Sequence, residues 1–491
     1  MLKDHVFEDD GLSKEERKEK ISELQDYLSG SLQRLTTEKL PVIVLVEGYS
    51  AAGKGTLINK LISEIDPRYC SVFNYEALPI EERRYPYLHP FFCALPEEGK
   101  IQFMDLGWME DAVRNRLSGD WDGKRYRQNL LSARRFERQL KNNGYLVIKL
   151  FMAIDRETQK QRLDDLRKKE STAWRVDAHD LRQNAKFDDV TRAYDDFMQE
   201  TGESFPWHII DGSNSSKACY NAFRIITDAI KDTFASGKYN GEPYDEEFPL
   251  VEMPKLKDVD LSPCLTQEEY KSELKRLQGS IEELQYRIKR KNIPVIIAYE
   301  GWDAAGKGGN IKRLAYPLDP RGMKVHPIGS PEPHEKARHF LYRFYTRLPE
   351  TGSFAIFDRT WYGRVMVERL EGFCTENDWK RAYNEINEFE EDMVNWGALV
   401  LKFWIDIDSD TQLQRFEDRQ NTPEKQWKIT DEDWRNREKW DQYEVAVDEM
   451  LEKTSTKFAP WHIIESVDKK YARIKVLRIV EEELTRILKE R

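Results

Sequence analysis

The sequence lacks the features that mark membrane and exported proteins. Its longest apolar runs, such as residues 42–46 and 295–299, have five residues, whereas a membrane-spanning helix needs roughly 18. Its first residues, MLKDHVFEDDG, carry charges where a signal peptide has an apolar stretch. We therefore expect a protein without membrane spans that is not exported.

Cysteine is scarce and irregularly placed. The chain has five cysteines: Cys70, Cys93, Cys219, Cys264 and Cys374. None forms a CxxC pair, so neither a disulfide framework nor a zinc site is expected. A reducing compartment, the cytoplasm, suits such a chain best.

Positive charge is also in deficit. Lys and Arg number 78 against 89 Asp and Glu, which gives a net charge of -11. Non-specific nucleic-acid binding depends on a broad positive surface, so we expect no nucleic-acid partner. Any polyanion must instead bind in a local basic groove.

The 491 residues contain one domain twice. PVIVLVEGYSAAGKGT from Pro41 resembles PVIIAYEGWDAAGKGG from Pro294, and an offset of 253 residues relates Lys54 to Lys307. The offset continues to 254 near the end, where PWHII recurs. We predict a first domain over 1–235, a linker over 236–263 rich in Gly, Pro and charge, and a second domain over 264–491.

Each half follows the order of an α/β protein. An amphipathic helix is expected over 268–291, and apolar strands over 354–357 and 398–405. Strands this apolar are buried on both faces, as in a parallel sheet flanked by helices. The sequence predicts tandem α/β domains of this kind.

The motif GWDAAGKG from Gly301 follows a strand and precedes a helix. Glycines allow backbone N–H groups to converge on phosphate oxygens, the helix start adds partial positive charge, and Lys307 adds a full charge. The expected phosphate-binding residues of this loop are Gly301, Ala304, Ala305, Gly306, Lys307, Gly308 and Gly309. The alternative is a tight turn with a surface lysine.

Two carboxylates are candidates for a Mg²⁺ site. A common nucleotide-binding loop has Ser or Thr after its lysine to hold the metal, but Gly308 stands here. Asp303 lies inside the loop and Asp358 follows the strand over 354–357, at the edge of the sheet where ligands bind. The alternative for Asp358 is a turn or capping residue.

Basic and aromatic residues surround these carboxylates in the sequence. Arg359, Trp361, Tyr362 and Arg364 directly follow Asp358, and we expect them to bind phosphate or a base. A third group, Arg415, Arg419, Lys425 and Lys428, is interrupted by Pro423 and is expected to form a mobile helical lid that closes over a phosphoryl group. The alternative is a solvated charged helix.

The GxDxxGKG loop, the DRxWYxR segment and the arginine-bearing helix with its PxKxWK stretch closely resemble the polyphosphate kinase 2 family. The resemblance spans both halves, as in the two-domain type of that family. It implies a thymidylate-kinase-like P-loop fold with a helical lid, and Mg²⁺-dependent transfer of a phosphoryl group from inorganic polyphosphate to AMP, giving ADP.

The resemblance also implies roles for individual residues. Asp303 and Asp358 would position the metal and the acceptor phosphate. Lys307 and Arg359 would hold polyphosphate, and Arg415 and Arg419 would close over the transfer.

The first half keeps the scaffold but loses the reactive side chains. Ser50, Leu106, Met109, Asp111 and Leu166 replace Asp303, Arg359, Tyr362, Arg364 and Arg419. We therefore predict that the second half is catalytic and that the first is a degenerate copy. The copy could provide an interface within the chain, so a monomer with paired domains and a homo-oligomer are both open.

Two other functions remain alternatives. The chain could be an ATP-dependent nucleotide kinase or P-loop NTPase, or a non-catalytic scaffold that binds nucleotide or polyphosphate. We favour direct in-line phosphoryl transfer because it needs positioning and positive charge rather than a covalent intermediate.

Overall fold

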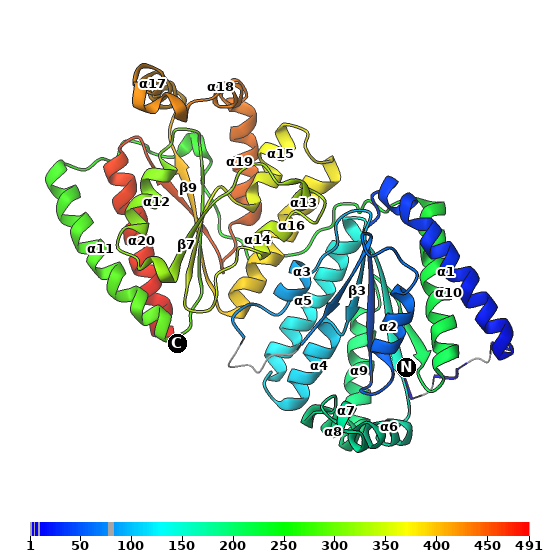
Figure 1. The fold of residues 1–491 in the computed structure, drawn as a ribbon. Helices are drawn as coiled ribbons and strands as arrows, with labels where there is room; N and C mark the ends of the chain where they lie inside the picture. The colour runs from blue at the N-terminus through cyan, green and yellow to red at the C-terminus, as the bar shows by residue number, and fades with distance from the viewer. Residues whose placement is uncertain (1, 4, 8–9, 77–82, 491) are drawn as a thin grey trace. The chain divides into compact units, whose positions relative to one another are not determined.

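The computed structural model describes residues 2–490 apart from 4, 8–9 and 77–82, and it describes Lys428 without its side chain. The chain forms two compact units (Figure 1). Unit 1 is made of residues up to 83, 87–241 and 333–342, and unit 2 of residues 84–86, 242–332 and 343 onward.

Unit 1 contains a parallel sheet of five strands in the order β2-β3-β1-β4-β5. The strands are β1 (Val42–Gly48), β2 (Cys70–Asn74), β3 (Ile101–Asp105), β4 (Leu146–Ala153) and β5 (Trp207–Asp211). The helices are α1 (Lys14–Thr37), α2 (Lys54–Ile62), α3 (His89–Cys93), α4 (Trp108–Ser118), α5 (Gly123–Asn142), α6 (Arg156–Lys168), α7 (Glu170–Ala173), α8 (Ala178–Ala185), α9 (Phe187–Thr201) and α10 (Ser215–Ser236).

Unit 2 repeats this sheet in the order β7-β8-β6-β9-β10, again parallel. Its strands are β6 (Val295–Gly301), β7 (Met323–Pro327), β8 (Phe354–Asp358), β9 (Leu399–Asp406) and β10 (Trp461–Glu465). Helices α11 (Gln267–Arg290), α12 (Lys307–Ala315), α14 (Tyr342–Tyr345), α15 (Val367–Leu370), α16 (Glu376–Trp396), α17 (Ser409–Asn421), α18 (Asp431–Glu438), α19 (Trp440–Thr454) and α20 (Lys469–Glu490) accompany them. Short elements are η2 (Leu256–Asp258), η3 (Pro320–Gly322), η4 (Trp361–Val365) and η5 (Pro423–Lys428), and α13 (Pro333–Lys336) groups with unit 1.

The predicted fold class, two tandem parallel sheets flanked by helices, is therefore confirmed. The expected helix over 268–291 is α11, and the expected strands over 354–357 and 398–405 are β8 and β9. Every residue of β9 is buried, including the charged Lys402 and Asp406. Burial of both faces explains why these strands read as continuous apolar runs rather than alternating ones.

Local sequence signals set the ends of α11 and its packing. Thr266 and Glu269 form a capping box, in which the backbone N–H of each residue donates to the other's side chain, at 2.8 Å and 3.2 Å. Leu277, Ile281 and Ile288 are fully buried, and α11 packs against α20. Each such side chain contributes about 1.5–3 kcal/mol through burial.

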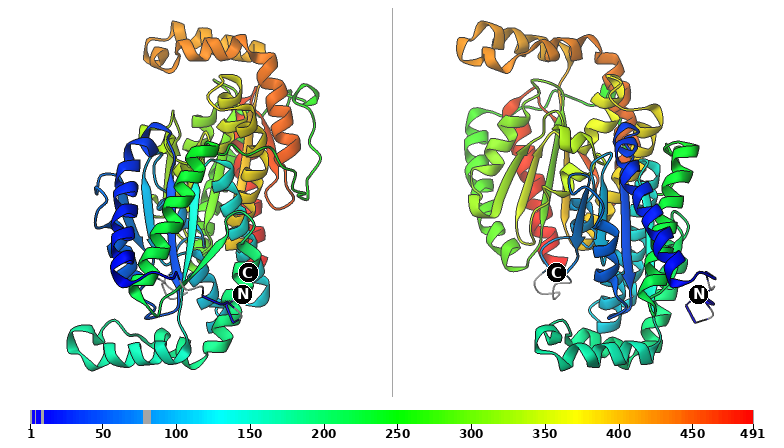
Figure 2. Two further views of the ribbon diagram at one scale, coloured as in Figure 1. Left: turned by 90° about the vertical axis from the view of Figure 1, so that its right-hand side faces the viewer. Right: turned by 45° about the vertical axis from the view of Figure 1, so that its right-hand side comes forward.

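A projecting arm completes unit 2. It consists of α17, η5 and α18, and it extends away from the sheet in both views of Figure 2. Unit 1 has a corresponding arm made of α6, α7 and α8. The lid expected around Arg415 to Lys428 is the arm of unit 2.

Candidate functional site

The loop between β6 and α12 has a backbone that only glycine allows at two points. Gly301 has φ +148°, and a Cβ there would overlap the carbonyl oxygen of Ile405. Gly306, directly before α12, has φ +114°. These conformations turn the chain sharply from the strand into the helix and leave the first N–H groups of α12 facing the loop.

Lys307 folds back over this loop. Its Nζ donates to the carbonyl oxygens of Gly301 at 2.5 Å and Trp302 at 3.2 Å. Lys54 of unit 1 makes the same two bonds, to Gly48 at 2.9 Å and Tyr49 at 3.0 Å. The ammonium group is thus held at the concave side of the loop, where a phosphate would meet it.

The two candidate metal ligands lie beside this loop. The Asp303 side chain is 15% exposed, and its carboxylate accepts from Asn436 Nδ2 at 2.9 Å and lies 3.5 Å from Arg359 Nη2. Asp358 ends β8, and among the described residues its carboxylate has no hydrogen-bond partner. Free oxygen lone pairs on carboxylates are what Mg²⁺ requires.

The described residues contain no group of three or more His, Cys, Asp or Glu side chains that could hold a metal. Mg²⁺ commonly binds through one or two carboxylates, with phosphate oxygens and water filling its other positions. Asp303 and Asp358 therefore suit a metal that arrives with a phosphate ligand.

Arg359 occupies a strained position next to these carboxylates. Its φ is +65°, in the left-handed region that disfavours a branched or bulky side chain. Burial alone lowers the pKa of Arg359, but the charges of Asp303 and Glu300 outweigh it and raise that pKa. The guanidinium, half exposed, is therefore held beside Asp303 in its charged form.

Glu300 fixes the segment that follows Arg359. The Glu300 Oε1 accepts from the backbone N–H of Thr360 at 2.6 Å and from its hydroxyl at 2.8 Å. Burial raises the pKa of this carboxyl group. A buried polar side chain thus ties the end of β6 to the turn after β8.

The aromatic residues of this segment differ from the expectation that they bind substrate. Trp361 is 1% exposed and Tyr362 fully buried, and both donate to Glu390 Oε1, at 3.0 Å and 2.6 Å. Lys402 donates to the other oxygen of Glu390 at 2.7 Å and to the Tyr362 hydroxyl at 2.8 Å. The structure gives both rings a place in a core network, because burying Glu390 and Lys402 requires such partners.

Arg364 and the glycines also have defined places. The Arg364 side chain is 17% exposed and pairs with Glu368 at 3.0 Å. Gly308 and Gly309 form the first turn of α12, where a Cβ on Gly309 would lie 3.3 Å from Arg473 Nη2. Ala304 has φ +60°, and Ala305 is fully buried.

Arg415 does not reach outward as expected of a lid arginine. Its Nη1 donates to the carbonyl oxygens of Ala304 and Ala305, at 3.0 Å and 2.9 Å, and its Nη2 to those of Ser466 and Val467, at 2.6 Å and 3.1 Å. Burial, reinforced by the charges of neighbouring arginines, lowers its pKa to about 10. Arg415 therefore holds the loop in place, and its contact with the phosphate-binding loop is through the loop's backbone.

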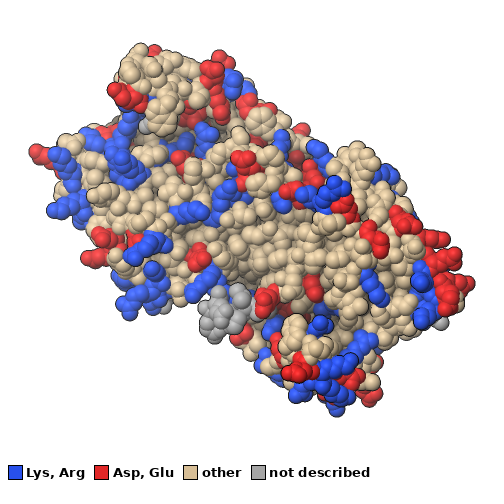
Figure 3. Space-filling model, in the orientation of Figure 1, with Lys and Arg blue, Asp and Glu red and all other residues tan. Residues whose placement is uncertain are grey.

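Several cations surround this site, and two of them, Lys469 and Arg473, were not predicted from the sequence. Burial and the charges of Arg415, Arg473 and Lys425 lower the pKa of Lys469, at the start of α20, to about 8. Arg419 is half buried on α17, and the side chain of Lys428 lies outside the described residues. Figure 3 shows Lys and Arg side chains gathered below the arm on this face of unit 2. We name Arg419, Lys425, Lys469 and Arg473 the cationic cluster.

The internal repeat could have revealed Lys469 and Arg473. At an offset of 254, their counterparts in unit 1 are Ser215 and Cys219, while Arg419 and Lys425 correspond to Leu166 and Thr172 at 253. All four members of the cationic cluster are therefore neutral in unit 1. The signal was a difference in charge between the halves, and it begins 41 residues after Lys428, the last residue of the predicted lid.

Unit 1 keeps the loop geometry without the reactive groups. Arg162 donates to the carbonyl oxygens of Ala51 at 3.1 Å and Gly212 at 3.0 Å, as Arg415 does in unit 2. In place of Gly363, unit 1 has the buried Glu110, whose carboxylate bonds His179 at 2.9 Å and Tyr194 at 2.7 Å. The space beside its loop is thus filled by an internal hydrogen-bonded cluster.

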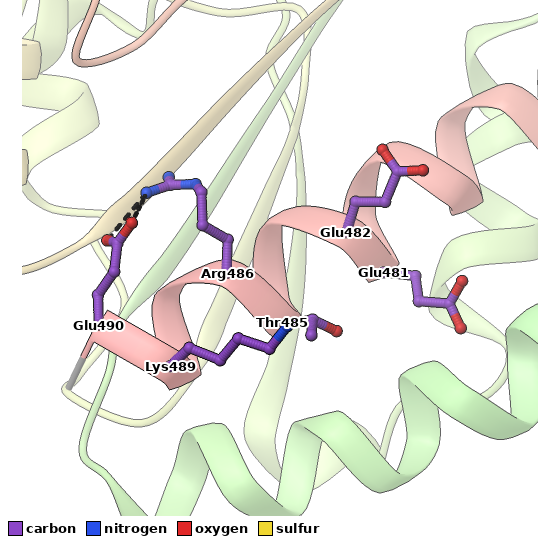
Figure 4. A pocket seen from close by; sticks show the side chains of 6 residues that line it. All are labelled: Glu481, Glu482, Thr485, Arg486, Lys489 and Glu490. Carbon is purple, nitrogen blue, oxygen red and sulfur yellow. Dashed lines mark hydrogen bonds and ion pairs between the residues drawn. The ribbon is translucent and has the colours of Figure 1, made fainter.

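A separate hollow lies on α20, lined by Glu481, Glu482, Thr485, Arg486, Lys489 and Glu490 (Figure 4). Its nearest lining residue is 12 positions along α20 from Lys469, about 18 Å at 1.5 Å per residue. Of the lining side chains, Arg486 pairs with Glu490 and Glu481 pairs with Arg276 of α11. This hollow carries no part of the loop chemistry.

No helix in the described part of the chain is long and apolar enough to cross a membrane.

Comparison with known proteins gives consistent matches. The family model "Polyphosphate kinase 2" matches residues 11–237 and 264–491. The chain is 38% identical to a polyphosphate:AMP phosphotransferase of Pseudomonas syringae and 36% identical to one of Pseudomonas aeruginosa, and each alignment covers 90% or more of this chain and 90% of the relative. A crystal structure of a putative polyphosphate kinase 2 from Pseudomonas aeruginosa superimposes with a TM-score of 0.84 at 33% identity, over 98% of this chain and 97% of that one.

The family match covers both units, and the relatives align along nearly their whole length. The similarity therefore extends over both units and is not confined to the loop motifs. This chain belongs to the polyphosphate kinase 2 family.

Proposed function

We propose that this protein transfers a phosphoryl group from inorganic polyphosphate to AMP, giving ADP, and that unit 2 carries the reaction. The observation that supports this most is the convergence of Lys307, Asp303 and Arg359 beside one loop in unit 2, with no equivalent of the last two in unit 1. Two relatives named polyphosphate:AMP phosphotransferase align over nine-tenths of their length.

The donor is held by positive charge. Lys307 and the N–H groups at the start of α12 face the end of the polyphosphate chain, and Arg359 lies beside them. The cationic cluster continues this positive region with Lys469 and Arg473 at the start of α20 and with Arg419 and Lys425 on the arm. So many cations close together repel one another, and a bound polyanion relieves that repulsion.

The acceptor and the metal use the carboxylates. Asp303 and Asp358 would hold Mg²⁺, which supplies neutralisation of the phosphate charge when bound. An oxygen of the AMP phosphate attacks the terminal phosphorus of polyphosphate, and the bond from that phosphorus to the next bridging oxygen breaks. The products are ADP and a chain shorter by one phosphate, with no covalent enzyme intermediate.

The remaining proposals concern organisation. We assign the catalytic role to 264–491, a degenerate, non-catalytic copy to 1–235, and the connection to 236–263. Five free cysteines suit a reducing cytoplasm, which we propose as the site of action. A monomer with paired domains and a homo-oligomer remain the two candidate states, and measurement of the mass in solution separates them.

The test is to incubate the full chain with AMP, long-chain polyphosphate and Mg²⁺ without any nucleoside triphosphate, and to separate the nucleotides by chromatography. ADP formation supports the proposal. ADP formation only when ATP is supplied would indicate an ATP-dependent nucleotide kinase. Binding of polyphosphate without any product would indicate a scaffold.

A further inference from the structure

Both ends of the arm meet at one residue of the loop, Asp303. On the outgoing helix α17, Gln412 Nε2 donates to the Asp303 carbonyl oxygen at 3.2 Å. On the returning helix α18, Asn436 Nδ2 donates to Asp303 Oδ2 at 2.9 Å. Arg437 joins the two helices by donating to Gln412 Oε1 at 3.2 Å and to the Ser409 carbonyl oxygen at 2.7 Å.

The base of the arm is anchored next to this point. Trp440, which begins α19, stacks on Trp302 with ring centroids 3.7 Å apart and planes 11° from parallel. Trp302 Nε1 in turn donates to Asp406 Oδ1 at 2.8 Å. Trp302 directly precedes Asp303, and Trp440 lies two residues after the end of α18. The stack therefore fixes the position of the end of α18 relative to the Asp303 carboxylate.

The amide of Asn436 has one possible orientation here. A carboxylate accepts hydrogen bonds and donates none, so the NH₂ group must face Asp303 Oδ2. The amide oxygen of Asn436 lies 3.4 Å from the Tyr443 hydroxyl, which donates to it. The contact to Arg359 on the other carboxylate oxygen is longer, at 3.5 Å, and Arg359 is half exposed. Asn436 therefore makes the shorter of the two contacts with the Asp303 carboxylate.

Unit 1 shows the same framework with the opposite hydrogen-bond direction. Gln183 stands at the position of Asn436, and its Oε1 accepts from the backbone N–H of Ser50 at 2.7 Å and from Gln159 at 2.6 Å. Ser50 occupies the position of Asp303. In unit 1, where the loop carries no carboxylate, the side-chain amide of Gln183 accepts a hydrogen bond from the loop. In unit 2, where the loop carries Asp303, the side-chain amide of Asn436 donates one to it.

We propose that Asn436 is the positioning residue for the Asp303 carboxylate, and that the arm thereby sets the orientation of a ligand for the divalent cation. This inference rests on the proposed role of Asp303 in the reaction. One lone pair of Oδ2 is engaged by Asn436, and the remaining lone pairs are held in a fixed direction. Without Asn436, the carboxylate rotates toward Arg359.

The first test measures the contact itself without metal or substrate. Hydrogen exchange in the peptide covering 431–438 is compared in the full chain for wild type, Asn436→Ala, Asp303→Ala and the double variant. We expect each single variant to raise the exchange rate about tenfold or more, as for loss of one hydrogen bond to a charged group. The double variant should add little further. Unchanged exchange in both single variants overturns the proposal.

The second test separates positioning from folding. Asn436→Ala should raise the Mg²⁺ concentration for half-maximal rate about fivefold and leave KM for AMP within about twofold. Asn436→Gln, which keeps a side-chain amide that can donate to Asp303, should recover most of the Mg²⁺ response. Tyr443→Phe removes the other partner of Asn436 and should leave the Mg²⁺ response near that of wild type.

Asp303→Asn makes the two possible failures distinguishable. If Asp303→Asn shifts the Mg²⁺ response and Asn436→Ala does not, the proposed function stands and the positioning role of Asn436 is wrong. If Asp303→Asn leaves the Mg²⁺ response unchanged, the role of Asp303 fails and the inference fails with it.

Discussion

The guanidinium of Arg415 donates to the carbonyl oxygen of Ala305 at 2.9 Å, so an arginine of the arm holds the phosphate-binding loop by its backbone. Removing it leaves up to four carbonyl oxygens without their donor, and two of these bonds are buried. We expect Arg415→Ala to lower the stability of unit 2 by about 2–4 kcal/mol, since bonds to charged groups are worth about 1.5–3 kcal/mol each and relaxation recovers part of the loss. Calorimetry should show a lower Tm, and the assay of ADP formation should show a loss of turnover.

Arg162→Ala is the matched control, because Arg162 makes the corresponding bonds in unit 1. Arg162→Ala should lower the Tm of unit 1, while kcat per folded molecule stays within about threefold of wild type. If Arg415→Ala abolished turnover with no change in Tm, the direct phosphoryl contact expected from the sequence would be favoured instead.

The sequence was sufficient for the architecture because its signals are local. The apolar strands, the glycine-rich loop and the capping box of α11 each lie within a few residues, and the repeat doubles the evidence for them. Asp303 and Arg359 lie close together in the structure because parallel topology brings the loop after β6 and the end of β8 to one edge of the sheet.

The structure differs from the sequence-based predictions where the contacts of a residue depend on the direction of its side chain. Nothing in the spacing of Trp361 and Tyr362 shows that both rings turn inward to Glu390. Similarly, helical periodicity places Arg415 near Arg419, but only the tertiary contacts show that Arg415 faces the loop's carbonyl groups. Lys469 and Arg473 were missed because α20 is distant in sequence and its helical pattern is unremarkable there.

The buried pair of Lys402 and Glu390 should be expensive to break. Lys402→Met leaves the Glu390 carboxylate without its cation in a fully buried place, and we expect a loss of about 3–5 kcal/mol in the free energy of unfolding of unit 2. Chemical denaturation followed by fluorescence would measure it. The double variant Lys402→Met, Glu390→Leu should recover at least half of the loss, and a double variant as unstable as the single one would contradict this account.

Asp406 should give unit 2 a pH-dependent stability. Burial raises its pKa to about 6, from 3.8 for an unperturbed Asp, although the indole N–H groups of Trp302 and Trp404 oppose this. The folded state therefore keeps the proton longer than the unfolded state, and stability present below about pH 4 is lost as pH rises to about 6. Two pKa units correspond to about 3 kcal/mol.

Asp406→Asn keeps a side-chain oxygen that can accept from both indole N–H groups and removes the titratable carboxyl group. Relative to wild type, the variant should therefore gain up to about 3 kcal/mol in free energy of unfolding between pH 4 and pH 7. Denaturation curves at the two pH values measure the gain. An equal difference between variant and wild type at both pH values would show that Asp406 has an ordinary pKa.

The cationic cluster should act on the donor alone. Lys469→Ala removes one cation beside Arg473, and we expect KM for polyphosphate to rise about tenfold, as for one lost charge-assisted contact. KM for AMP should stay within about twofold. Ser215→Ala, at the corresponding place in unit 1, should change neither constant, and a rise in KM for AMP alone with Lys469→Ala would place the cluster at the acceptor instead.

Only one of the two phosphate-binding loops, that of unit 2, is expected to be catalytic. Lys307 and Lys54 make the same pair of backbone contacts, so replacing either by Ala perturbs its loop alike. The decisive measurement is the rate of ADP formation from AMP, polyphosphate and Mg²⁺ in the two variants. We predict that Lys307→Ala removes nearly all turnover and that Lys54→Ala keeps more than about a tenth, since losing a charged contact to the moving phosphate costs several kcal/mol. Equal losses in both variants would contradict the assignment of catalysis to unit 2.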